Sequence, residues 1–244
     1  DHLSLPHLPL QFVDYAYWQH DLHKHHHYDS KMLYWRKLLS SPLPVLGLSD
    51  VRSGAGNTDA HIIAFQVPPE VVDSLKRVSR EYRTSFNVVL LTIYATALCR
   101  QAGQDSVLVQ VPIAGRSKET EQLIGCFAEA LILKVSVSSD QFFREHVRQA
   151  HSQLYEGLKH AIPLTLLSNG LDVRPAEKLK MHRAVLHWEQ TLSLRDTAQI
   201  EKGGLEAAPF EPGDQESAQI AAQTHSVLNI NEQADGSMKG EWWF

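Results

Sequence analysis

The stretch Val107–Lys134, VLVQVPIAGRSKETEQLIGCFAEALILK, decides the fold of this chain. The apolar run Val107–Ile113 predicts a buried strand, and Ala114–Arg116 predicts a tight turn directly after it. A short polar helix is expected next, and Ile124–Gly125 then opens a second apolar strand, whose core is expected over residues 127–137. Glycines where strands end or begin let another chain or a ligand approach the backbone closely. The stretch therefore predicts two core strands whose connection can meet a ligand.

Helical and extended patterns alternate along the rest of the chain. Residues 11–40 are predicted to form a helical entry region interrupted by a His-rich turn, and residues 60–244 an α/β sandwich. Residues 195–218 are rich in Gly, Glu, Pro and Ala without a period, which predicts a long crossover loop. The fold class is therefore α/β, a two-layer sandwich of a mixed β-sheet with helices on one face. Helices are expected over residues 69–83, 86–101, 141–159 and 163–170, and further strands over 61–67, 184–192, 225–231 and 238–244.

Composition excludes several classes of protein. A net charge of −5 over 244 residues argues against a nucleic-acid partner, for which a basic stripe is expected. No apolar run approaches the roughly 20 residues of a membrane span, and no signal peptide is recognisable. Cys99 and Cys126 lie in apolar segments, which predicts buried, reduced thiols. We therefore expect a cytoplasmic chain without membrane or nucleic-acid contacts.

Four collinear segments resemble the condensation domains of nonribosomal peptide synthetases. That family shows a strand ending G-x-P-x-[AS]-G-R and a strand opening I-G-x-F-[VA]-N, and Pro112–Ala128 resembles both. Phe12–Gln19 is similar to its Y-x-D-[FY]-A-x-W-Q motif, and Tyr34–Leu39 to its Y-W-[RK]-x-x-L motif. Asn229–Gly240 is similar to its late hairpin.

The resemblance implies that residues 1–244 are the C-terminal lobe of a chloramphenicol-acetyltransferase-like pair, cut from a larger enzyme. In that family, the active site is a tunnel between two lobes, which a phosphopantetheine arm enters from each side. The implied partners are the N-terminal lobe of the same domain and peptidyl or acyl carrier domains. The phosphopantetheine arms belong to these carriers, and no cofactor is expected on this chain.

The family's general-base signature, His-His-x-x-x-Asp-Gly, normally precedes the Y-x-D motif and has no match here. His25–Ser30 fails as a substitute because its acid comes one residue too early and no Gly follows. No catalytic residue is therefore assigned to this chain.

Three residues are predicted to line the tunnel, namely Ala114, Gly115 and Glu129. The small residues Ala114 and Gly115 would leave room for a thin pantetheine arm, and a purely structural turn is the alternative. Glu129 stands where the family usually has Asn, on a strand face with apolar neighbours. It is either a solvent-facing residue at a strand end or a desolvated carboxylate that could orient an amine.

The other motif residues are expected to be structural. Arg116 is predicted to pair with Glu119 or Glu121, because most Arg–carboxylate pairs are scaffold. A structural role is expected for three further residues, Gly125, Asp14 and Trp18.

The His-rich segment His20–His27 places His23 and His27 at i, i+4, a spacing that can bind a metal. Structural zinc, however, usually has four ligands with Cys or carboxylate support. An exposed polar turn is the favoured interpretation, so no metal site is predicted.

Three functions stay open from the sequence. The first is amide-bond formation between a carrier-bound acyl or peptidyl thioester and an aminoacyl acceptor. The second is a non-catalytic carrier-recruiting or scaffold lobe of a degenerate condensation domain. It is favoured by Glu129 in place of Asn, and by loss of the acids of an H-x-D-x-P-F-E motif after His160. The third is a stand-alone acyltransferase of similar fold. Whether the parent is an active enzyme depends on the sequence upstream.

Overall fold

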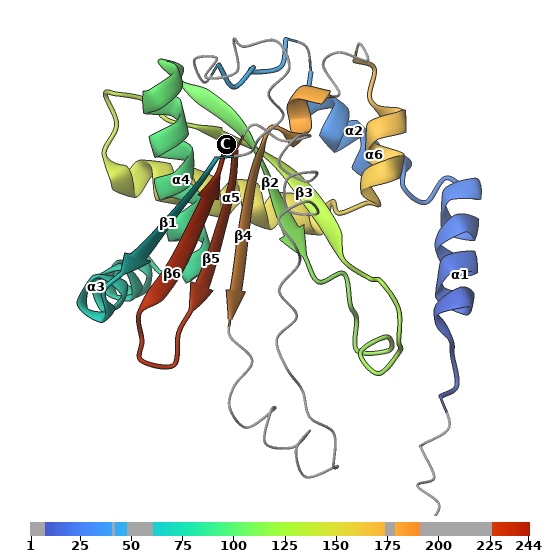
Figure 1. The fold of residues 1–244 in the computed structure, drawn as a ribbon. Coiled ribbons are helices and arrows are strands. Elements are labelled where there is room, and N and C mark those ends of the chain that lie inside the picture. The colour runs from blue at the N-terminus through green and yellow to red at the C-terminus, as the bar shows by residue number, and fades with distance from the viewer. Residues whose placement is uncertain (1–7, 41, 48–60, 174–178, 191–225) are drawn as a thin grey trace, which may run out of the picture.

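The computed structural model describes residues 8–40, 42–47, 61–173, 179–190 and 226–244 (Figure 1). The crossover loop predicted over residues 195–218 lies outside the described residues.

A six-stranded mixed sheet forms the centre of the molecule, in the order β1-β6-β5-β4-β2-β3. The central strand β4 runs parallel to both of its neighbours, β5 and β2, and the remaining pairs are antiparallel. The sheet confirms the predicted α/β class. Its strands are β1 (Ile62–Val67), β2 (Ser106–Ile113), β3 (Glu129–Ser136), β4 (Ala184–Gln190), β5 (Ser226–Glu232) and β6 (Met238–Trp243).

Two long helices, α4 (Phe86–Ala102) and α5 (Phe143–Lys159), pack against the sheet, and α3 (Pro69–Glu81) packs against α4 (Figure 1). The Ser85 hydroxyl accepts the Val88 N–H and begins α4, and Gly103 ends it with a φ of +62°. Apolar residues cover several sides of α4, because it lies between the sheet and its helical neighbours.

The entry region forms two helices, α1 (Phe12–Lys24) and α2 (Asp29–Leu38), on either side of the His-rich turn. The short helices α6 (Leu164–Gly170) and η1 (Leu179–His182) follow α5. Trp35 fixes α2 to the end of α5. Its side chain is 1% exposed, and its indole N–H donates to the His160 carbonyl at 2.7 Å. The Tyr34 ring stacks on the His160 ring at 4.2 Å, which gives His160 a structural place.

A buried polar network ties α4 to the far strands. The Tyr94 hydroxyl and the Ser226 hydroxyl lie 2.7 Å apart, and the Trp242 indole N–H donates to the same Ser226 oxygen at 2.7 Å. Burial raises the pKa of Tyr94 well above its usual range. Each polar atom in this network therefore has a partner, as burial requires.

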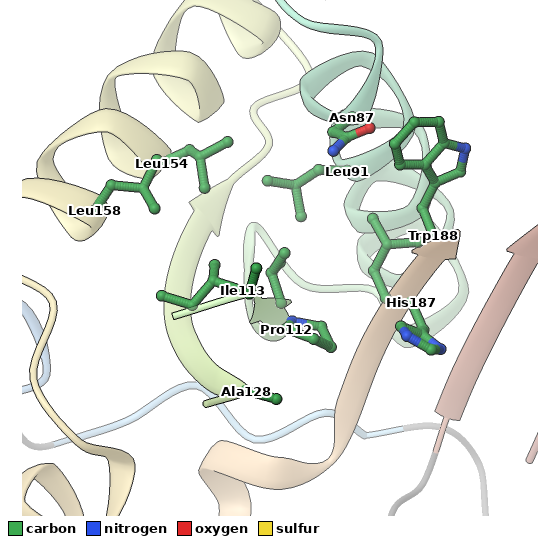
Figure 2. A pocket seen from close by; sticks show the side chains of 12 residues that line it. Asn87, Leu91, Pro112, Ile113, Ala128, Leu154, Leu158, His187 and Trp188 are labelled. Atoms are coloured by element: carbon green, nitrogen blue, oxygen red, sulfur yellow. The ribbon is translucent and has the colours of Figure 1, made fainter. Parts of the chain in front are cut away.

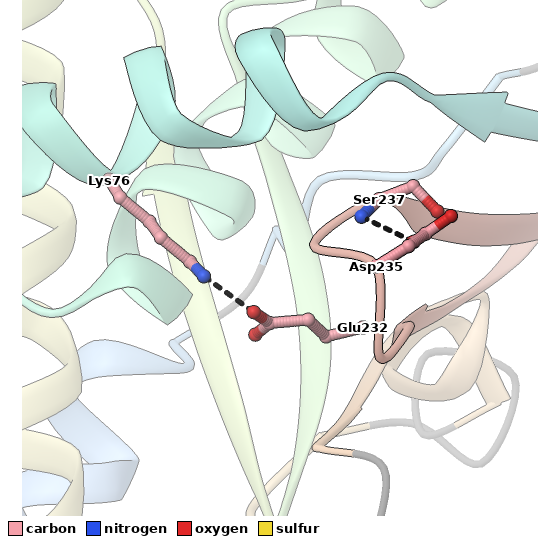
Figure 3. Close-up of polar contacts among 4 residues, drawn as sticks. All are labelled: Lys76, Glu232, Asp235 and Ser237. Atoms are coloured by element: carbon pink, nitrogen blue, oxygen red, sulfur yellow. Dashed lines mark hydrogen bonds and ion pairs between the residues drawn. The ribbon is translucent and has the colours of Figure 1, made fainter.

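An ion pair joins α3 to the end of β5 (Figure 3). The Lys76 ammonium lies 2.5 Å from the Glu232 carboxylate, and both side chains are half-buried. In the turn before β6, the Asp235 carboxylate accepts the Ser237 N–H at 2.9 Å. Hydrogen bonding from the Ser237 side chain first, and from its backbone N–H second, lowers the pKa of Asp235. The turn residue Gly236 has a φ of +83°, which favours glycine.

Three local predictions were wrong. The segment after Arg116 forms turns instead of a helix, and the second strand begins at Glu129 instead of Ile124. The cause is Arg116, because its guanidinium hydrogen-bonds to backbone carbonyls of this segment and fixes an irregular backbone. Cys126 is exposed, because it lies in this segment and not in a strand; Cys99 is buried as expected.

Candidate functional site

Arg116 organises the connection between β2 and β3, which spans residues 114–128. Its guanidinium donates to the carbonyl oxygens of Thr120 at 2.9 Å, Leu123 at 2.8 Å and Gly125 at 3.1 Å. These carbonyls take the place of the expected partners, the carboxylates of Glu119 and Glu121. The guanidinium is planar and has several N–H donors, so this one side chain can hydrogen-bond three backbone carbonyls at once.

Gly115 brings the two ends of this connection together. Its φ is +63°, and a Cβ added there would overlap the Phe127 carbonyl oxygen. The same Cβ would lie 3.6 Å from the Glu129 Cγ. The structure therefore places two of the three predicted tunnel residues, Gly115 and Glu129, side by side. Only glycine fits the contact, because both its conformation and its neighbour exclude a side chain.

Glu129 begins β3 and is half-buried. Its carboxylate accepts the Leu164 N–H at 3.2 Å, at the first residue of α6. The sequence left open a solvent-facing residue or a desolvated carboxylate, and the structure shows a half-buried carboxylate that is hydrogen-bonded to the N-terminal residue of α6. Burial first, and the Glu129 charge second, raise the pKa of Tyr15. Burial, then Tyr15, then Glu129 raise the pKa of Tyr28.

Helix α1 rests on this connection through aromatic rings. The rings of Phe12 and Tyr15 lie 5.1 Å and 4.9 Å from the buried ring of Phe127. A Cβ at Gly125 would overlap the Phe12 ring, so this glycine permits the contact. Phe127 is thus the centre of a small apolar cluster between α1 and the end of the sheet.

The two α1 motif residues occupy different places. The Asp14 carboxylate accepts the Gln11 N–H at 2.8 Å and completes a capping box at the start of α1. Trp18 is 56% exposed, and its ring lies 5.8 Å from the Tyr15 ring. Asp14 therefore has a clear local partner, whereas Trp18 shows most of its surface to solvent.

The parallel strands β2 and β4 separate soon after they meet. They pair at one position, Gln110 with Val185, whereas β4 and β5 pair along their whole length. Just before β2, the Val137 N–H donates to the Asp105 carbonyl at 2.8 Å. The β2–β3 register continues from this pair, so the odd-numbered residues of β2 bond to β3 and the even-numbered ones face β4. The next even-numbered residue after Gln110 is Pro112, which has no N–H to donate.

A cavity of about 400 Å³ lies where these strands have separated (Figure 2). The carboxyl-terminal ends of β2 and β4 form one side of it, and α4 and α5 contribute the other side. Most of its surface is apolar, Asn87 and His187 are its polar lining residues, and no Asp, Glu, Lys or Arg from the part of the chain that the structure describes lines it. Ala114 lines this cavity, but Gly115 and Glu129 do not, so the three predicted tunnel residues divide between two adjoining places. Other lining residues include Leu91, Ile113, Leu154, Leu158, Leu186 and Trp188.

The wall contributed by α4 and β4 was missed from the sequence. Trp188 and Leu91 lie on elements far from Ala114 in the chain, and no local pattern joins them. One signal was present, namely Pro112 inside a strand, because proline in a central strand marks a break in pairing.

The histidine segment forms local contacts. His25 lies 3.3 Å from Asp21, and His26, at a φ of +61°, lies 3.2 Å from Asp29. Among the described residues, which include all of His20–His27, no three His, Cys, Asp or Glu side chains come together in a way that could hold a metal. In the same described part of the chain, no helix has the length and apolarity that crossing a membrane requires.

The fold and the β2–β3 connection define a lobe of the condensation type. The structure of the condensation domain from the monacolin K polyketide synthase MokA has a TM-score of 0.76 and 20% identity to this chain, over 100% of this chain and 57% of that one. This likeness shows the shared fold.

The family model of the condensation domain matches residues 2–220. The chain therefore belongs to the condensation domain family of nonribosomal peptide synthetases, as the four motifs predicted. It is 33% identical over 164 residues to a plipastatin synthase of Bacillus subtilis (strain 168), covering 64% of this chain and 4% of that protein. It is 31% identical over 177 residues to tyrocidine synthase 3 of Brevibacillus parabrevis, covering 70% and 3%. The chain thus spans a small part of these relatives.

Proposed function

We propose that residues 1–244 are the C-terminal lobe of a condensation domain and form one wall of its amide-forming site. The amine of a carrier-bound aminoacyl group attacks the carbonyl carbon of a carrier-bound acyl or peptidyl thioester. A C–N bond forms, the C–S bond breaks, and the thiol leaves with the proton that the amine gives up. The N-terminal lobe supplies the histidine that accepts this proton from the amine and passes it to the leaving thiolate, since no residue here matches the family's base.

One observation carries this proposal: the motif that resembles the family's strand end borders a cavity. Ala114 lines the cavity, and Gly115 beside it brings the backbone of β2 against Phe127 and Glu129. A phosphopantetheine arm is long and thin, so it needs walls of backbone and small side chains. We assign Ala114, Gly115 and Glu129 to such a wall, and Arg116 and Gly125 to its support.

The partners follow from this assignment. The N-terminal lobe closes the tunnel, and carrier domains deliver both substrates on their own phosphopantetheine arms. We place this assembly in the cytoplasm.

The parent synthetase carrying Ala114→Trp tests the proposal. A large ring at this position blocks the wall, so the yield of the carrier-bound amide product should fall at least tenfold, measured by intact-protein mass spectrometry. Ala97→Trp is the matched control, because Ala97 is exposed on α4 and does not line the cavity. Equal amide yields from both variants would overturn the assignment.

The second candidate function is a non-catalytic lobe that recruits carrier domains. It is favoured by the Glu129 carboxylate, which is bonded to the Leu164 N–H in place of a substrate amine. Carrier binding by the parent synthetase without any amide product would support this second function.

A further inference from the structure

We infer that the cavity between β2 and β4 binds the apolar portion of a carrier-bound acyl group and sets the size that the domain accepts. This inference rests on the proposed function and adds the substrate class. The ligand class is an uncharged aliphatic or aromatic acyl chain attached as a thioester, and it could belong to the donor or to the acceptor.

The cavity is built into the backbone. Pro112 cannot continue the ladder with β4, so the separation of the two strands does not depend on the rotamer of any one side chain. Leu91 is 2% exposed and fixed on α4, and Trp188 is held in the parallel ladder opposite Ile230. A cavity with such walls is preformed, which reduces the entropy that a ligand loses on binding.

The lining decides the chemistry of the occupant. Leu91 of α4 and Leu154 of α5 point toward one another across the space (Figure 2), and Leu158, Leu186 and the Trp188 ring add apolar surface. Asn87 and His187 contribute the polar side chains of the lining. The volume of about 400 Å³ falls within the usual range for small-molecule sites. Because none of the described lining residues is an Asp, Glu, Lys or Arg, a charged group would lose its hydration here without gaining a permanently charged partner, so an uncharged chain is favoured. Each methylene buried should improve binding by roughly fourfold.

The position of the cavity connects it to the reaction. Ala114 and Ile113, at the end of β2, line it, and Gly115 follows directly. An acyl chain inside the cavity would therefore leave its thioester beside the wall that Gly115 and Glu129 form. Leu158 on α5 lines the cavity and is 47% exposed, so its side chain borders both the cavity and the solvent.

The test uses the parent synthetase with acetyl, butanoyl, hexanoyl and octanoyl N-acetylcysteamine thioesters as probes, and calorimetry as the readout. Affinity should rise with chain length up to the capacity of the cavity. A diazirine-bearing octanoyl thioester should crosslink to peptides from β2, β4 or α5. No preference for longer chains, or crosslinks confined to other parts of the protein, would overturn the inference.

Two variants on one helix separate filling of the cavity from general damage. Leu158→Trp places a ring across the opening and should weaken octanoyl binding at least tenfold. Tyr155→Trp, at a 63% exposed position that does not line the cavity, should change it less than twofold. If Leu158→Trp fails to fold, judged by circular dichroism, Leu154→Ala replaces it. This variant enlarges the cavity and should move the preferred chain length upward by one or two methylenes.

Activity assays distinguish this inference from the proposed function and identify the source of the acyl group. Acyl length is varied on the donor carrier in one series and on the acceptor carrier in another. The series whose length preference shifts in Leu158→Trp identifies the occupant. Amide formation with no shift in either series overturns the inference alone. Thioester binding that responds to Leu158→Trp, without amide formation from any substrate, overturns the proposed function alone.

Discussion

The guanidinium of Arg116 lies 4.4 Å above the centre of the Phe127 ring, while it donates to backbone carbonyls on the same connection. Arg116 therefore fixes the β2–β3 connection by hydrogen bonds and also covers the aromatic cluster against which α1 packs. Cation–π contact and hydrogen bonding add in this geometry, because they use different parts of the group.

Arg116→Lys should lower the free energy of unfolding by about 2 kcal/mol, because an ammonium cannot reach three carbonyls in one plane. Urea unfolding of the purified chain measures this. Arg144→Lys is the control, since Arg144 also lies over a ring, that of Tyr82 at 5.0 Å, but in an exposed ion pair with Glu81. Its effect should stay within about 0.5 kcal/mol. Equal losses of unfolding free energy in the two variants would contradict a special structural role for Arg116.

Gly115→Ala should lower the free energy of unfolding by about 3 kcal/mol or more. The added methyl group overlaps the Phe127 carbonyl, and the backbone conformation already disfavours alanine. Gly103→Ala provides a direct comparison. Gly103 has nearly the same φ, +62° against +63°, but nothing lies within 4 Å of its added Cβ. Gly103→Ala should lower the free energy of unfolding by about 1–2 kcal/mol, from the backbone conformation alone. Similar unfolding midpoints for the two variants would show that the close contact does not matter.

Trp35→Phe should destabilise the chain by about 2 kcal/mol, because it leaves the His160 carbonyl without its donor and a gap beside α5. Thermal and urea unfolding report the loss. Trp243→Phe is the matched change, since that indole donates to Glu241 in an exposed setting at 3.2 Å, and it should be nearly neutral. A Trp35→Phe protein as stable as the original would show that another contact fixes α2.

Stability should fall as the pH rises above 10, the ordinary pKa of a tyrosine phenol. Burial raises the pKa of Tyr94, so the folded state keeps the phenol proton at a pH where the unfolded chain releases it. Burial also raises the pKa of Cys99 to about 11, which contributes a fall of the same sign from about pH 9.

Tyr94→Phe isolates the contribution of this phenol. The unfolding free energy of the variant should decline less steeply between pH 10 and 11 than that of the original chain, although it starts about 1 kcal/mol lower at pH 7. Parallel curves over this range would contradict the link between burial of Tyr94 and alkaline unfolding.

Local sequence patterns predicted the elements well where the pattern is continuous. The apolar run Val107–Ile113 matches the bounds of β2 to within one residue. Helix α4 begins after Ser85 and ends before Gly103, as these capping residues predict. The same approach failed over residues 117–128. The backbone there is fixed by hydrogen bonds to the Arg116 guanidinium, and these leave no hydrophobic periodicity in the sequence. The candidate site divided likewise. Gly115 and Glu129 are near one another across a β2–β3 pair, a local relationship that strand alternation and the motif indicate. The cavity depends on β4, which joins β2 from far along the chain.

The pairing of β1 with β6 has a consequence for synthesis on the ribosome. Ile62 pairs with Trp243, so β1 leaves the exit tunnel long before its neighbour has been translated. At about 5–20 residues per second, the delay is on the order of ten seconds or more. Throughout that interval Ile63 and Phe65 belong to a nascent strand with an unpaired edge, which is a template for pairing with another chain. We expect the last step of co-translational folding to be the docking of this early strand, and nascent chains stalled before β6 to depend on chaperones.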